Sequence, residues 1–231
     1  MRIQSPSTVE RKIVIDAFSP ENFQEIDEAL QRIKNTRSGK SLLKQIDKHS
    51  RNGKFVKIHV TAFESTETVP TLTHKQFQKY QLAEDKANIA RNLAVKRGFC
   101  KAPGTSATLK YNQFWNDFGM SNGWSFHDII EEDDEENDTT LFHELVHAMR
   151  ILKGTYTDDN SYHGHEKEML RAIGSMKYVS EPISENKFRE ERGLQMRSFY
   201  PVFTAVNPDD PDAFEVNNTH TSFRPGIMTP D

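Results

Sequence analysis

The segment TTLFHELVHAMRILK (Thr139–Lys153) decides both the fold and the chemistry that this chain can carry out. Its apolar residues recur at the three- and four-residue spacing of an amphipathic helix. They are Leu141, Leu145, Ala148 and Leu152. Asp138 or Thr139 is the expected N-cap, and Gly154 is expected to end the helix. The segment is therefore predicted to be a capped amphipathic helix.

Two histidines and a glutamate give this helix its chemistry. His143 and His147 are four residues apart, so a helix places both imidazoles on one face, where they can bind a single metal ion. Glu144 projects beside the open coordination position, where it can hold a water and take its proton. The alternative is a surface helix with two unrelated histidines. We predict a metallopeptidase site with one Zn²⁺ per chain.

The third zinc ligand distinguishes the subclasses of zinc peptidase. A metzincin carries a histidine six residues after His147, but this position is a lysine. A gluzincin carries a glutamate about twenty residues further on, on a second helix, and Glu166 and Glu168 both lie in that window. Helical periodicity alone slightly favours Glu166. His163 and His165 are further candidates.

Composition limits the classes of partner. The 231 residues suffice for one large domain or two small ones, and the net charge of −4 argues against nucleic acid as the main partner. No stretch approaches the roughly 18 apolar residues of a membrane span, and the N-terminus lacks the apolar region of a secretory signal peptide. The single cysteine cannot form an internal disulfide, which indicates a reducing compartment. We therefore expect neither a nucleic-acid nor a membrane partner.

The order of the predicted elements indicates an α+β fold. Residues 1–10 are predicted as a disordered tail, 11–201 as the globular domain and 202–231 as a loop-rich or disordered tail. Strands are predicted at residues 11–18, at 54–63 and through 107–112. Helices are predicted from residue 20 onward and at 40–48, 74–97, 139–153, 165–177 and 184–193.

A second segment, SENKFREERGLQMRSFYP (Ser184–Pro201), has no generic physical reason for its sequence. Together with His143–His147 it resembles the NleD-type type III secreted effector metalloproteases, and the resemblance is close from about residue 104 to residue 201. It implies a compact zincin-type domain with a zinc helix, a small mixed sheet and a second helix that carries a ligand. It also implies that His143 and His147 bind zinc and that Glu144 is the catalytic carboxylate.

The resemblance also bears on the third ligand. The family pattern contains a glutamate that is followed three residues later by arginine and six residues later by glycine. These positions match Glu168, Arg171 and Gly174. The match favours Glu168 over Glu166 as the third zinc ligand.

A virulence function is implied by the same resemblance. The protein would be delivered by a type III secretion system into the host cell cytoplasm, with the secretion machinery and a chaperone as partners. The implied substrates are host signalling proteins, namely stress-activated MAP kinases cut in the activation loop near the Thr-x-Tyr motif. The alternative is a non-catalytic, zinc-containing effector that binds a basic host partner through its acidic run, Glu131–Asp138.

Two further groups of residues are expected near the cleaved bond. The strand Ala107–Asn112 is expected at the edge of the sheet, where an extended substrate can pair with it. Its substrate-binding residues would be Leu109, Tyr111 and Asn112. Arg197 and Tyr200 are expected to stabilise the oxyanion, because the clostridial neurotoxin proteases, which are also gluzincins, use an Arg-x-x-Tyr pair of similar spacing.

Overall fold

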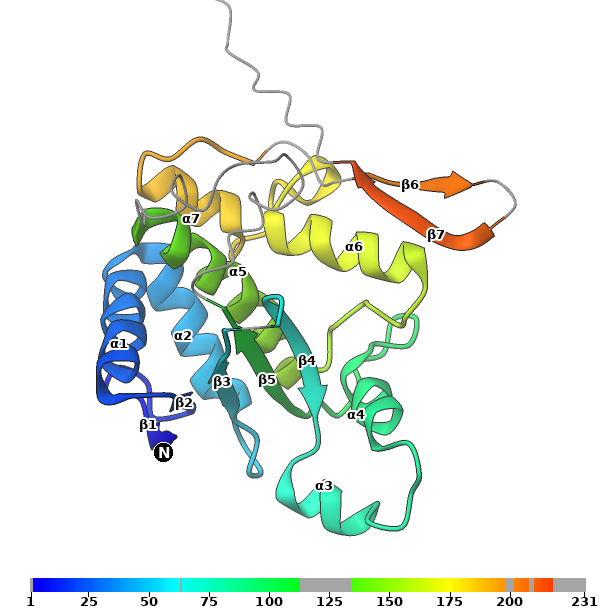
Figure 1. Ribbon diagram of the computed structural model, residues 1–231, viewed down its shortest axis with the longest axis horizontal. Helices are drawn as coiled ribbons and strands as arrows, with labels where there is room; N and C mark the ends of the chain where they lie inside the picture. Colours follow the sequence, from blue (N-terminus) through cyan, green and yellow to red (C-terminus); the bar gives the residue numbers. More distant parts are fainter. Residues whose placement is uncertain (1, 63, 113–133, 198–201, 208–209, 218–231) are drawn as a thin grey trace, which may run out of the picture. The chain divides into compact units, whose positions relative to one another are not determined.

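The computed structural model describes residues 2–62, 64–112, 134–197, 202–207 and 210–217 (Figure 1). The chain divides into two compact units, residues 1–197 and 198–231. Among the described residues, the first unit contains a five-stranded sheet and seven α-helices. In the second unit, strands β6 (Val202–Asn207) and β7 (Asp210–Asn217) pair antiparallel. The mixed α+β class is as predicted.

The sheet of the first unit has the spatial strand order β1-β2-β3-β5-β4. The strands are β1 (Ile3–Pro6), β2 (Ile13–Ala17), β3 (Val56–Val60), β4 (Glu67–Thr71) and β5 (Ser106–Tyr111). Strands β2, β3 and β5 run parallel, and β1 and β4 pair antiparallel with them at the two ends of this order. Ile15, Ile58 and Leu109 are partners across the three central strands and are fully buried. This row of side chains belongs to the hydrophobic core.

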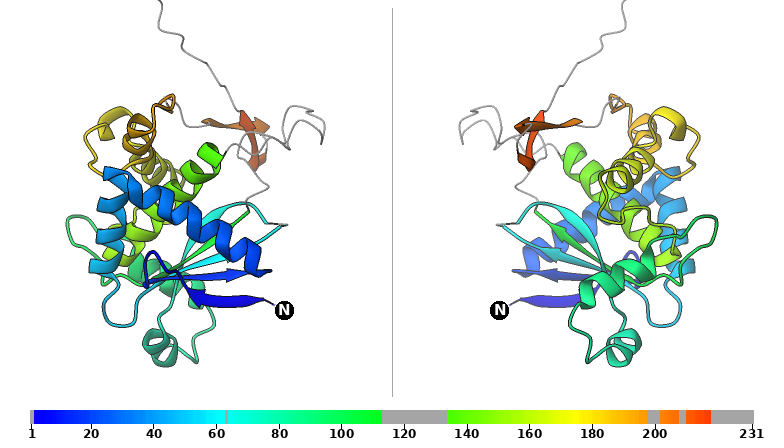
Figure 2. Two further views of the ribbon diagram at one scale, coloured as in Figure 1. Left: turned by 90° about the vertical axis from the view of Figure 1, so that its left-hand side faces the viewer. Right: turned by 90° about the vertical axis from the view of Figure 1, so that its right-hand side faces the viewer.

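Helices cover one face of the sheet (Figure 2). They are α1 (Pro20–Asn35), α2 (Arg37–His49) and α5 (Asp134–Lys153). Helix α5 packs against β4 and β5, and also contacts α6 (Tyr162–Ile173) and α7 (Glu185–Glu191). Every residue of α5 from 141 to 152 is buried, so α5 is the central helix of the unit. None of the described helices is long and apolar enough to cross a membrane.

Local capping fixes the corner between α1 and α2. The hydroxyl of Ser19 accepts an amide hydrogen bond from the first turn of α1, where Pro20 occupies the start of the helix. Thr36 ends α1 and caps α2 by accepting a hydrogen bond from the Gly39 amide. Glycine is required at this position because a Cβ on Gly39 would lie 1.8 Å from the carbonyl oxygen of Ile33. The two helices therefore approach each other closely.

The structure corrects several predicted elements. Residues 3–6 lie in the segment predicted to be disordered, but they form β1 and pair with β2. The helix predicted at 74–97 is two helices, α3 (His74–Lys79) and α4 (Lys86–Ala94), because the side chain of Asp85 caps the second one. Strand β4 was not predicted, since its five residues lack a clear apolar alternation. The tail predicted as loop-rich contains β6 and β7.

The central helix begins earlier than predicted, at Asp134 instead of Thr139. Asp138 is therefore not a cap. Its fully buried carboxylate accepts two hydrogen bonds of 2.8 Å from Arg32 of α1 and one of 2.7 Å from Arg192, just after α7. This ion pair links three helices around the start of α5.

Candidate metal site and catalytic carboxylate

Helix α5 brings the three residues of the His-Glu-x-x-His pattern together in the core. His143, Glu144 and His147 are all buried, and each offers a ligand atom within 4.8 Å of the others. The Nε2 atoms of the two histidines lie 3.0 Å apart. Within the part of the chain that the structure describes, this is the group of histidine, cysteine and acidic side chains able to hold a metal ion.

Two buried glutamates determine which ring nitrogens face each other. Nδ1 of His143 lies 2.8 Å from Oε2 of Glu185, and Nδ1 of His147 lies 3.2 Å from Oε1 of Glu168. An ionised carboxylate can only accept a hydrogen bond, so both Nδ1 atoms carry a proton. In the neutral imidazoles both Nε2 atoms then present lone pairs to one another.

A cation bound by both Nε2 atoms would remove the repulsion between their lone pairs. Two lone pairs 3.0 Å apart repel, whereas two imidazole nitrogens bound to one tetrahedral Zn²⁺ are about 3.3 Å apart. Burial on its own lowers the pKa of His147, but the hydrogen bond to Glu168 and the charge of Glu144 outweigh burial and raise it. The same negative field favours a metal cation. The residues present therefore fit a metal held by both Nε2 atoms.

The position of Glu168 differs from the one expected of a third ligand. Besides His147, its carboxylate accepts hydrogen bonds from Arg150 at 2.6 and 3.1 Å and from the amide and hydroxyl of Thr157 at 2.8 and 2.7 Å. Burial alone would raise the pKa of Glu168, but the charge of Arg150 and the hydrogen bond from His147 hold it well below its usual range. The carboxylate lies against Nδ1 of His147, on the other side of the ring from Nε2. This geometry suits orientation of the imidazole and not metal ligation.

The other candidates for the third ligand also stand apart from the metal-facing nitrogens. The side chain of His163 is 92% exposed and lies 3.8 Å from Glu166, whose side chain is 43% exposed. His165 lies 3.0 Å from Asp158. None of these residues belongs to the metal-capable group found among the described residues.

Glu185 is a site residue that the sequence did not reveal. It is the first residue of α7, is almost completely buried, and accepts a 2.7 Å hydrogen bond from Arg189 in addition to its contact with His143. Burial alone would raise its pKa, but the hydrogen bond from His143 and the charges of Arg197 and Arg189 hold the pKa well below its usual range. Glu185 belongs to the distinctive segment Ser184–Pro201, which was the only signal available.

Strand β4 reaches the catalytic carboxylate. The hydroxyl of Thr68 donates to Oε2 of Glu144 at 2.6 Å and lies 3.2 Å from the backbone oxygen of the same residue. Thr68 is buried in the second position of β4. The contact fixes one carboxylate oxygen of Glu144 against the end strand of the sheet.

Comparison with protein families agrees with this geometry. The model of the M91 peptidase family, described as effector protein, matches residues 11–200. The chain belongs to the M91 peptidase family. This is the NleD-type effector metalloprotease family, as the resemblance predicted. None of the curated proteins matches the chain. Membership, together with the His143–Glu144–His147 group, supports a protease that uses a metal ion.

In this M91 peptidase the strand expected to bind substrate is not at the edge of the sheet. Strand β5 pairs with β3 on one side and with β4 on the other. Leu109 is fully buried, and Tyr111 and Asn112 are 2% exposed. The expectation that Ala107–Asn112 is an edge strand is therefore wrong, because the unpredicted strand β4 covers it.

Two remaining expectations concern residues near the C-terminal end of the M91 match. Nη1 of Arg197 lies 3.4 Å from Oε2 of Glu185, so Arg197 reaches His143 only through that carboxylate. Tyr200 lies outside the described residues.

In the acidic run, residues 131–133 also lie outside the described residues, and Asp138 is buried against Arg32 and Arg192. Asp138 is thus not part of a docking surface.

Proposed function

We propose that this M91 peptidase is a zinc endopeptidase that a type III secretion system delivers into the host cell cytoplasm, where it cleaves a host protein. The observation that carries the proposal is the pair of Nε2 atoms 3.0 Å apart, with the Glu144 carboxylate in the same buried group. A tetrahedral metal ion bound by both Nε2 atoms would satisfy these two nitrogens and fill half of its coordination positions with them.

His143 and His147 would hold the ion through Nε2, with Glu168 and Glu185 fixing their orientation. Bound Zn²⁺ would supply Lewis acidity for the scissile carbonyl and lower the pKa of water at the site. Glu144 is the general base. It takes the proton of the attacking water and gives it to the leaving amine. The hydroxyl of Thr68 donates a hydrogen bond to Oε2 of Glu144, which leaves the second carboxylate oxygen to exchange the proton.

The substrate would lie along β4. Among the described residues β4 pairs only with β5, so its other side can accept an extended peptide. Pro70 is consistent with this position, because proline in a sheet occurs mainly on edge strands. A peptide paired with β4 would pass Thr68 and therefore Glu144. This assignment replaces the one made for Ala107–Asn112.

The resemblance to the NleD-type effectors supports stress-activated MAP kinases as substrates, cut in the activation loop. A flexible loop of this kind can be drawn out as a strand beside β4. The same resemblance supports the secretion machinery and a chaperone as partners during delivery. Arg197 and Tyr200 are proposed as donors to the oxyanion, on the strength of their Arg-x-x-Tyr spacing.

Incubation of the purified protein with host-cell lysate tests the proposal. Fragments should form with the wild type and disappear with a chelator. The Glu144→Gln variant should bind metal and yield no fragments, because it loses the base and keeps both histidines. Turnover near the wild-type rate in Glu144→Gln would refute the mechanism. A panel of purified MAP kinases tests the substrate separately. If lysate proteins are cut but no kinase is, the protease assignment stands and the substrate assignment fails.

A further inference from the structure

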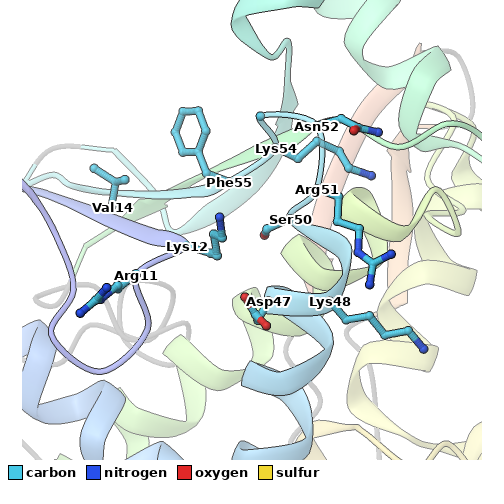
Figure 3. A pocket seen from close by; sticks show the side chains of 11 residues that line it. Arg11, Lys12, Val14, Asp47, Lys48, Ser50, Arg51, Asn52, Lys54 and Phe55 are labelled. Carbon is cyan, nitrogen blue, oxygen red and sulfur yellow. The ribbon is translucent and has the colours of Figure 1, made fainter.

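A hollow of about 720 Å³ lies outside the metal site, between the start of β2, the end of α2 and the start of β3 (Figure 3). It is lined by Arg11, Lys12, Val14, Asp47, Lys48, Ser50, Arg51, Asn52, Gly53, Lys54 and Phe55. The last turn of α2 and the turn to β3 supply most of these residues. None of them contacts the histidines or glutamates of the metal site, so the hollow requires its own explanation.

Positive charge is concentrated in this hollow. Five lining side chains are lysine or arginine and one, Asp47, is acidic, although the whole chain has a net charge of −4. Within the part of the chain that the structure describes, no ion pair involves Arg11, Lys12, Lys48 or Arg51. Lys54 donates to the backbone oxygen of Leu152 at 2.6 Å, at the C-terminal end of α5. Five cations with a single acidic neighbour repel one another, and this repulsion costs stability unless an anion binds.

The positive charges around the hollow also affect the pKa of a neighbouring histidine. Burial lowers the pKa of His49, and the charges of Lys153, Lys48 and Lys54 lower it further. Lys153 lies one residue beyond Leu152, so the positive region continues to the end of α5. The positive charge at the hollow is therefore part of a larger cationic region.

Ser50 supplies a second, independent indication of a ligand. Its hydroxyl is buried and has no hydrogen-bond partner among the described residues, although buried polar groups are almost always paired. Ser50 is the C-cap of α2 and is one of the residues that line the hollow together with the cationic side chains (Figure 3). A rotation of the Ser50 side chain would bring this hydroxyl to the hollow, where an oxygen-rich anion would accept its proton.

We propose that the hollow binds a compact anion with two or more phosphate groups. Its volume lies in the range of small-molecule sites, and its five cations come from the residues just before β2, the last turn of α2 and the turn to β3. Phosphate oxygens accept charge-assisted hydrogen bonds from lysine and arginine, and several phosphates match several cations. Val14 and Phe55 provide an apolar surface that the carbon skeleton of such a ligand can contact. The same chemistry occurs in a free polyphosphorylated metabolite and in the headgroup of a phosphoinositide lipid.

Calorimetric titration of the full chain with sodium tripolyphosphate, at about 0.15 M ionic strength, tests this site. The double variant Lys12→Glu/Arg51→Glu should bind at least about tenfold more weakly than the wild type, because it loses two charged donors. The matched control Lys40→Glu/Lys75→Glu makes the same change in net charge at exposed helix positions and should bind like the wild type. Unchanged thermal midpoints without ligand would show that both variants fold.

Two further measurements identify the source of the phosphates and the role of the Ser50 hydroxyl. Phosphatidylcholine vesicles that contain phosphatidylinositol bisphosphate should bind if a lipid headgroup is the ligand, whereas binding of tripolyphosphate alone indicates a free compound. Ser50→Ala should weaken binding about threefold without lowering the thermal midpoint of the free protein. The proposal is overturned if neither probe binds, if the control variant loses as much affinity as the double variant, or if polyglutamate binds as tightly as tripolyphosphate.

Discussion

Oε1 of Glu168 lies 3.2 Å from Nδ1 of His147, on the ring edge opposite the nitrogen that faces His143. Glu185 bears the same relation to His143 from a different helix. Each carboxylate fixes the tautomer and the orientation of one imidazole, and each is held in turn by arginine. The metal-facing arrangement on α5 thus depends on α6 and α7.

The Glu168→Gln variant should therefore keep one metal ion per chain. We expect its metal affinity to fall about 10- to 100-fold, because the amide orients His147 less firmly and leaves the charge of Arg150 uncompensated. Competition with a coloured chelator measures the affinity, and elemental analysis measures the stoichiometry. Glu185→Gln should behave similarly through His143. Glu166→Gln, on the same helix but without a contact to His147, is the control and should match the wild type. Loss of stoichiometric metal in folded Glu168→Gln would restore Glu168 as a ligand.

The second prediction concerns Thr68, which contacts the catalytic carboxylate of the same site. Replacement of Thr68 by valine keeps the shape of the side chain but removes the 2.6 Å hydrogen bond to Glu144. We expect kcat to fall about tenfold, with KM and metal content nearly unchanged, because the catalytic carboxylate loses its fixed orientation.

The control for this prediction is Thr68→Ser, which retains the hydroxyl and should restore most of kcat. If valine and serine reduce kcat equally, the effect comes from packing, and the hydrogen bond has no catalytic role.

The sequence alone predicted the metal-facing residues because they lie within one helix. The spacing of His143 and His147 and the apolar periodicity around them are local features, and a helix converts them directly into a shared face. The helices predicted from residue 20 onward and at 40–48, which are α1 and α2, rest on local patterns of the same kind. For these helices, the local sequence pattern and the structure agree.

Long-range contacts account for what the sequence did not reveal. Helical periodicity could place Glu168 on a helix face, but it could not tell which side of the His147 ring the carboxylate would reach. Glu185 is 42 residues from His143, and Asp138 is 106 residues from Arg32. Strand β4 is short and depends on pairing with β5, so it left no local pattern, and the edge position was assigned to the wrong strand.

The buried carboxylate of Asp138 should contribute to stability. Asp138→Asn removes the charge that two arginines share, and we expect the free energy of unfolding to fall. The loss should be smaller than the roughly 3–5 kcal/mol of a fully buried ion pair, because the Arg32 side chain is 36% exposed. Urea denaturation of both proteins measures the difference. The exposed Glu84→Gln makes the same chemical change and should have little effect; an equal loss in both variants would contradict the role of Asp138.

A cluster on the sheet should make stability depend on pH. The carboxylate of Asp16 in β2 accepts a 2.7 Å hydrogen bond from Arg2 and lies 2.7 Å from Lys57 and 2.9 Å from His59. Burial alone would raise the pKa of Asp16. The hydrogen bonds from Lys57, Arg2 and His59 outweigh burial and hold the pKa well below its usual range.

Because the pKa of Asp16 is lower in the folded than in the unfolded chain, its ionised form stabilises the fold above the unfolded value of about 3.9. This contribution is lost as the pH falls from there toward the folded pKa. The difference in unfolding free energy between the wild type and Asp16→Asn should therefore be fully present at about pH 5, and should shrink below about pH 4. Other acidic groups titrate in both proteins and cancel in the comparison. Urea denaturation at a series of pH values measures the difference, and a difference that stays constant down to about pH 3 would show that ionised Asp16 does not stabilise the sheet.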